Sequence, residues 1–359
     1  MKLLHGLISA LLLLLVAEST ATPAEADRIR KSWESAAESW TLTSRAATTP
    51  EAKAAALAAR PDPLRYARQM WQVISPSLSK DWTLDPAAWF LNFTRSLTIT
   101  NADGSVAPAF TQENAAIRKA VATHHMQSPN LTPMCMALAR NQDPGTLSIL
   151  EKIQSSHPDT KVQGVAALAA ALVIKSLGDD AEPMRKRLTH LRKAIIQSSD
   201  VKIGDTTVAQ IAEDELYIIR NLTKGRIAPN LVGTDAASRP ITLDSTKGKV
   251  TMLLFWNTEM PESDRVLEIT NNTLRKFKGR PFTVIGVNHD PLAKLRTLEA
   301  DEVTNWKNFS DPEMKLAREY RINVLPQVLV LDGERKIHYF GAPGSFAEIT
   351  AEALLSETK

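Results

Sequence analysis

The pattern of apolar and polar residues changes once along the chain. From about residue 27 to about residue 223, apolar residues recur at three- and four-residue spacing in Ala-rich and Leu-rich segments, which predicts amphipathic helices. Beyond about residue 225, short apolar runs alternate with helical patterns, which is typical of an α/β domain. The predicted fold class is α + α/β, with an all-helical domain at residues 27–224 and an α/β domain at residues 225–359.

The helices of the first domain are expected to start near prolines and capping residues. The clearest are predicted at residues 62–74, 112–125, 144–154, 159–177, 181–197 and 208–222. Segment 98–110 contains Gly104, Pro108 and several polar residues, so it is predicted to be a loop. Segment 159–177 is so rich in alanine that close helix–helix packing is expected there. Helices of this length predict a bundle or a solenoid-like stack, although no repeat period stands out.

The second domain begins after a linker at Lys224-Gly225-Arg226. The turn Asp332-Gly333-Glu334 is typical of a hairpin. Strands are predicted at residues 250–255, 282–288, 327–331 and 337–340, and helices at residues 262–278, 291–298, 312–320 and 346–356.

The N-terminal residues 1–26 predict a secretory signal peptide. Lys2 supplies a positive charge, and residues 7–17 form an apolar segment of signal-peptide length rather than membrane-spanning length. Small residues allow cleavage after Ala21 or after Ala26. The pattern predicts an exported protein, periplasmic or extracellular, without a stable membrane anchor after cleavage. The alternative is a retained N-terminal anchor.

Composition narrows the possible functions. The net charge of +3 is too small to indicate a nucleic-acid partner. Cys135 is the only cysteine in the chain, so an intramolecular disulfide is impossible. The sequence contains no Gly-rich phosphate loop, zinc-spaced cluster or nucleophile elbow, and no cofactor is predicted.

One stretch of the second domain carries the candidate chemistry. Residues 249–264 read K-V-T-M-L-L-F-W-N-T-E-M-P-E-S-D, an apolar strand followed by a brief loop. Pro261 stands where it can open a helix, because the first helical residue needs no N–H. A helix N-terminus in this position would stabilise a thiolate through its dipole and free N–H groups.

Residues 255–263, F-W-N-T-E-M-P-E-S, resemble the F-W-A-T-W-C-P-P-C stretch of TlpA/ResA-type thiol–disulfide oxidoreductases, within the redoxin (AhpC/TSA) superfamily. The resemblance places Met260 at the attacking cysteine and Ser263 at the resolving cysteine. Glu259 replaces the usual tryptophan. Neither Met260 nor Ser263 can form a disulfide, so the resemblance implies the fold without the dithiol.

A second landmark supports the resemblance. Residues 322–326, I-N-V-L-P, followed by V-L-V-L-D, resemble the segment that carries the cis-proline of the thioredoxin fold. Together with the lead-in at residues 227–250, the resemblance covers about 130 residues in order, and it implies a cis Pro326 facing Met260. The helical first domain also resembles the extension that precedes redoxin domains in some exported bacterial proteins.

The preferred function is a redox-inactive, non-enzymatic module that binds a protein or peptide in the cell envelope; the sequence does not identify that partner. The predicted binding surface consists of Trp256, Glu259, Met260, Leu325 and Pro326. The first alternative is a thiol–disulfide oxidoreductase or antioxidant protein of the redoxin family. Ser263 as a nucleophile would need a base, and no histidine adjoins it in the sequence.

The second alternative is copper handling in the envelope. His124, His125, Met134 and Cys135 lie within a short stretch and offer imidazole, thioether and thiolate ligands that suit Cu(I). The competing interpretation is that Met134 and Cys135 fill a core and that the histidines end a helix. His289-Asp290, after a predicted strand, lies near the edge where α/β proteins bind ligands, but it is interpreted as a turn.

Overall fold

The computed structural model describes residues 21–141, 145–178, 180–260 and 262–357. Compactness divides the chain into two units. The first contains residues up to 178 together with residues 185–208, and the second contains residues 209–359 with a short segment before Arg185. This division precedes the predicted boundary at 224/225, because helix α10 (Val208–Asn221) groups with the second unit from Ala209 onward. In the described part of the chain, no helix is long and apolar enough to cross a membrane.

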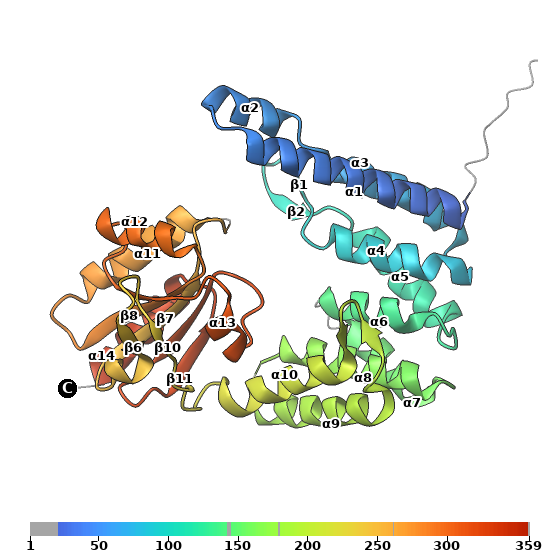
Figure 1. Ribbon diagram of the computed structural model, residues 1–359. Coiled ribbons are helices and arrows are strands. Elements are labelled where there is room, and N and C mark those ends of the chain that lie inside the picture. The colour runs from blue at the N-terminus through green and yellow to red at the C-terminus, as the bar shows by residue number, and fades with distance from the viewer. Residues whose placement is uncertain (1–20, 142–144, 179, 261, 358–359) are drawn as a thin grey trace, which may run out of the picture. The chain divides into compact units, whose positions relative to one another are not determined.

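The first unit consists mainly of helices (Figure 1). Ala-rich α8 packs against α6 and α7, and 11 of its 16 residues are buried. Gly164 of α8 allows the next helix to approach closely, because a Cβ there would lie 2.1 Å from the Ser198 hydroxyl oxygen. Close packing around this segment is therefore confirmed. The helices are α1 (Pro23–Ala46), α2 (Pro50–Ala58), α3 (Pro63–Ile74), α4 (Leu84–Thr94), α5 (Thr111–His124), α6 (Leu131–Arg140), α7 (Gly145–Ser156), α8 (Thr160–Lys175) and α9 (Ala181–Ser198).

The predicted loop at residues 98–110 is instead a β-hairpin. Strands β1 (Thr98–Thr100) and β2 (Val106–Pro108) pair antiparallel, with Ile99 opposite Ala107. Gly104 turns the chain at φ +81°, a conformation that glycine adopts without a steric penalty. The sequence prediction missed the hairpin because its strands are short and exposed. A second small hairpin pairs β3 (Lys202–Ile203) with β4 (Thr206–Thr207).

The second unit is built around a five-stranded sheet of order β11-β10-β7-β8-β9 (Figure 1). β7, β8 and β9 are parallel, while β10 is antiparallel to both β7 and β11. The strands are β7 (Val250–Trp256), β8 (Phe282–Asn288), β9 (Lys307–Ser310), β10 (Gln327–Leu331) and β11 (Ile337–Gly341). A short hairpin, β5 (Val232–Thr234) and β6 (Pro240–Thr242), precedes the sheet.

Helices cover both faces of this sheet, and the alternation of side chains along β7 shows why. Leu253 and Phe255 belong to a core that includes residues of α13, whereas Leu254 and Trp256 belong to a core that includes residues of α11, α12 and α14. A strand with an apolar side chain at nearly every position can serve two cores. The helices are α11 (Ser263–Lys276), α12 (Leu292–Ala300), α13 (Lys315–Glu319) and α14 (Ser345–Glu357).

Candidate functional site

The candidate site lies where the loop after β7 meets the turn before β10. Gln327 pairs with Phe255, which brings the turn at Leu325–Pro326 beside the end of β7. The Leu325–Pro326 peptide bond is cis, in agreement with the prediction. Leu325 packs against the core cluster to which Met260 belongs, so both predicted parts of the site border the same core.

Met260, which the sequence resemblance assigns to the position of the attacking cysteine, is packed into the core. Its side chain is buried, at 7% exposure, and its N–H donates to the side-chain oxygen of Asn257 at 2.8 Å. The N–H of Ser263 donates to the Met260 carbonyl at 3.3 Å, which closes a turn before α11. A thioether has no proton to lose, so this position supplies no thiolate.

The helix begins later than the sequence predicts. α11 starts at Ser263, after Glu262 in the left-handed conformation at φ +62°. Pro261, which we expected to open the helix, lies outside the described residues. Among the residues that the structure describes, no His or carboxylate side chain hydrogen-bonds the Ser263 hydroxyl, so a serine nucleophile has no base there.

Trp256 was wrongly predicted to be part of the binding surface. It is fully buried, and its indole N–H donates to the side-chain oxygen of Asn308 at 3.2 Å. The indole N–H of Trp306 donates to the same oxygen at 3.1 Å. The prediction failed because Trp256 is the last residue of a strand that is buried on both faces.

The exposed part of the site is smaller than predicted and includes a residue outside the predicted binding surface. Val324, immediately before Leu325, is 67% exposed, and Glu259 and Asn323 are also exposed. Leu325 and Pro326 are half-buried. We call Glu259, Asn323, Val324, Leu325 and Pro326 the cis-proline surface.

A buried polar cluster anchors the loop after β7. Asp290, at the end of β8, is 3% exposed and accepts hydrogen bonds from the Thr258 hydroxyl at 2.7 Å and the Thr258 N–H at 3.1 Å. The side-chain amide of Asn288 donates to the same carboxylate at 2.8 Å. His289-Asp290 is thus more than a solvent-exposed turn, because it holds the loop that positions Met260.

His289 and Asp311 continue this cluster. The His289 Nδ1–H donates to the Asp311 carbonyl at 2.9 Å and lies 3.4 Å from its carboxylate. The carboxylate also accepts the N–H groups of Lys315 and Ala317 at 2.7 and 3.0 Å, so it caps α13. Burial raises the pKa of Asp311, but the hydrogen bonds from His289 and from the helix amides outweigh it, and the net pKa is lowered.

We expect Asp311→Ala to destabilise the protein by about 2–4 kcal/mol near neutral pH, because two helix N–H groups lose a charged acceptor and His289 loses the nearby carboxylate. A lowered folded-state pKa means that the contribution is present above the unfolded pKa of about 3.9 and is lost as the pH falls through the folded pKa. Urea unfolding as a function of pH measures the difference. Exposed Glu313→Ala is the matched control, and an equal loss in both variants would contradict the assignment.

The proposed copper ligands are not arranged as a metal site. His124 is exposed, whereas buried His125 has its Nε2 2.7 Å from the Leu78 carbonyl and its Nδ1 3.6 Å from Asp81. Met134 and Cys135 are fully buried in α6, and burial raises the pKa of the Cys135 thiol to about 12. Within the described ranges, no group of three or more His, Cys, Asp and Glu side chains could hold a metal ion. Core packing accounts for the buried members of this cluster.

Part of the second unit is similar to known proteins. Residues 224–340 match the AhpC/TSA family. The thiol-disulfide oxidoreductase ResA of Bacillus cereus is 25% identical over 114 residues, covering 32% of this chain and 66% of ResA. ResA of Bacillus anthracis matches to the same extent. The chain thus spans just under two thirds of the length of these relatives.

Among solved structures, the thioredoxin domain of a thiol-disulfide oxidoreductase from Bacteroides vulgatus is 24% identical, with 38% of this chain and 99% of that chain covered and a TM-score of 0.34. A thiol:disulfide interchange protein from Bacteroides sp. is 25% identical, with 38% and 93% covered and a TM-score of 0.34. The residues that match the family include the candidate site around Met260 and Pro326. Residues 224–340 thus form a thioredoxin-like domain that matches the AhpC/TSA family and is similar to the thiol-disulfide oxidoreductase ResA.

Proposed function

We propose that the protein is a redox-inactive relative of these oxidoreductases and that its cis-proline surface binds an extended segment of another protein. One observation supports the proposal: the residues that the resemblance aligns with the dithiol are Met260 and Ser263, and Met260 is packed into the core. Disulfide exchange requires an attacking thiolate and a second sulfur to resolve the mixed disulfide. Cys135 cannot replace them, because it is fully buried in α6 and its pKa is raised to about 12.

The binding role rests on the exposed backbone and side chains around the cis peptide. Val324 offers an apolar side chain at 67% exposure, next to half-buried Leu325. Strand addition gains affinity from main-chain hydrogen bonds and specificity from alternate side chains, so neither contribution requires cysteine. Exposed Glu259, in the loop after β7, adds a negative charge and favours a basic residue in the bound segment.

A second candidate is thiol–disulfide exchange, which the resemblance to ResA favours. It would require this chain to react without either motif cysteine, and the two candidates therefore differ in a measurable activity. Export remains part of the proposal and is supported by the signal pattern in residues 1–26. Recovery of the native protein from the cytoplasmic fraction would contradict export.

The binding proposal predicts that Val324→Asp weakens binding to an unfolded protein by about tenfold, because a charge must be desolvated where an apolar contact formed. Reduced, carboxymethylated α-lactalbumin is a suitable probe, since it is unfolded and carries no free thiol. Fluorescence anisotropy with the labelled probe measures the affinity.

Val232→Asp is the matched control. Val232 lies in β5 of the same unit and is also 67% exposed, so it tests for a general effect of adding a surface charge. We expect the Val232 variant to bind as the unmodified protein does. Equal weakening in both variants, or no saturable binding by the unmodified protein, would refute binding at the cis-proline surface.

A further inference from the structure

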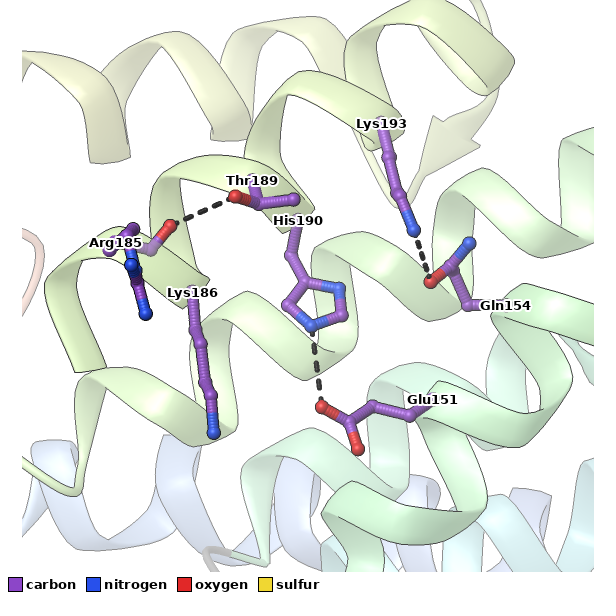
Figure 2. Close-up of a pocket in the computed structure, with 7 residues that line it drawn as sticks. All are labelled: Glu151, Gln154, Arg185, Lys186, Thr189, His190 and Lys193. Atoms are coloured by element: carbon purple, nitrogen blue, oxygen red, sulfur yellow. Dashed lines mark hydrogen bonds and ion pairs between the residues drawn. The ribbon is translucent and has the colours of Figure 1, made fainter. Parts of the chain in front are cut away.

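A hollow on the first unit lies between α7 and α9. Its volume is about 340 Å³, and Figure 2 shows the side chains that line it. α7 contributes Glu151 and Gln154. Most of the lining comes from α9, where residues four positions apart share one helix face. The hollow belongs entirely to the first unit and is independent of the thioredoxin-like domain.

The lining is predominantly positive. Arg185, Lys186 and Lys193 bring three cations from α9, and Glu151 is the one carboxylate among the lining residues. Lys193 donates to the Gln154 side-chain oxygen at 3.0 Å, which holds its ammonium group at the wall. Arg185 and Lys186 already have interaction partners, so neither offers an unpaired donor. The excess of positive charge favours an anionic ligand.

His190 distinguishes this hollow from an ordinary basic helix face. The residue is 8% exposed, and its Nε2 lies 3.5 Å from the Glu151 carboxylate. Its other ring nitrogen, Nδ1, is buried and has no hydrogen-bond partner among the described residues. In Figure 2 the imidazole stands between the lining side chains, with Nδ1 turned towards the side of Gln154 and Lys193. Buried polar atoms are rarely left unpaired, so this nitrogen indicates a missing partner.

We propose that this hollow binds a small divalent oxyanion of the sulfate or phosphate class, and that His190 takes up a proton when the anion binds. A neutral imidazole that donates from Nε2 to Glu151 presents a bare lone pair at Nδ1. The oxygens of such an anion are also acceptors. A proton from solvent must therefore add to Nδ1, which then donates to the anion while Nε2–H keeps its contact with Glu151.

The electrostatics of the empty hollow agree with this linkage. Burial lowers the pKa of His190, Glu151 raises it, and Lys193 and Lys186 lower it, with a net decrease. Without an anion the ring is therefore neutral at neutral pH. A bound dianion favours the protonated ring and raises the pKa of His190. The affinity for the dianion should increase as the pH falls from the pKa of His190 in the bound protein to its pKa in the free protein. Below that range the affinity should level off.

Sulfate is a better probe than inorganic phosphate, because sulfate stays divalent over the pH range in which histidine titrates. Calorimetric titration of the full chain at constant ionic strength, at about pH 6 and about pH 8, should show tighter binding at the lower pH. His190→Gln should remove this pH dependence, and Lys193→Gln should weaken binding about tenfold by removing a charged donor. Arg192 is an exposed residue of α9 outside the lining, so Arg192→Gln serves as the control. It should change the affinity for sulfate less than about twofold.

A second readout separates direct contact from a change of fold. The imidazole NMR signals of His190, assigned through the Gln variant, should shift to the protonated form when sulfate is added. The proposal would be overturned if sulfate bound saturably with an affinity that does not depend on pH. It would also be overturned if the Arg192 and Lys193 variants weakened sulfate binding equally. Inorganic phosphate and vesicles of anionic phospholipid distinguish the sources of such an anion: binding to phosphate supports the proposal, and binding to vesicles alone contradicts it.

Discussion

Gly286→Ala is expected to destabilise the second unit by about 3–4 kcal/mol, because β8 has no room for a methyl group at this position. A Cβ on Gly286 would lie 2.0 Å from the Asn308 side-chain oxygen, 2.9 Å from the indole nitrogen of Trp256 and 3.0 Å from that of Trp306. Asn308 accepts hydrogen bonds from both indoles. Moving its amide would leave two buried N–H groups without an acceptor, in addition to the steric strain.

Urea unfolding followed by tryptophan fluorescence measures this loss. Gly279→Ala is the control: Gly279 has open space around it and φ +82°, so alanine there should cost only about 1 kcal/mol of backbone strain. A double-mutant cycle sharpens the test, since Gly286→Ala should cost less when Asn308→Ala has already removed the clash. Equal costs at Gly286 and Gly279 would contradict the packing described for this cluster.

The apolar runs allowed much of the second unit to be predicted. β8 and β10 have the predicted bounds, because each is a buried run of strand-forming residues. β9 was missed, since Lys307–Ser310 is short and half polar, and only its pairing with β8 makes it a strand. Trp256 was misplaced because the strand was predicted to end at Phe255, whereas β7 continues through Trp256.

The functional features that were missed depend on residues far apart in the sequence. Thr258 and Asp290 meet because β7 and β8 are parallel, so their carboxyl ends lie side by side. The contact of His190 with Glu151 depends on how α7 packs beside α9, and residue spacing does not specify that arrangement. By contrast, the cis peptide bond at Pro326 could be predicted, because a local motif carries it.

The largest expected effect is a gain of redox activity by the variant Met260→Cys/Ser263→Cys. The Ser263 N–H to Met260 carbonyl hydrogen bond closes a tight turn, so we expect the two Cα atoms to lie within disulfide reach, about 4.4–6.8 Å. Ser263 is the first residue of α11, where the helix N-terminus would favour a thiolate. The double variant should therefore oxidise to an intramolecular bridge, whereas either single variant should not.

Reduction of insulin disulfides by the purified protein measures directly whether this chain has thiol–disulfide activity. The assay compares the unmodified chain, Cys135→Ser, and the Met260→Cys/Ser263→Cys variant as a positive control for the scaffold. We predict that the unmodified chain and Cys135→Ser stay at the rate of the buffer blank, while the double-cysteine variant rises above it. Turnover by the unmodified chain that persists in Cys135→Ser would contradict the account, because it would place thiol–disulfide activity in a protein without a usable thiol.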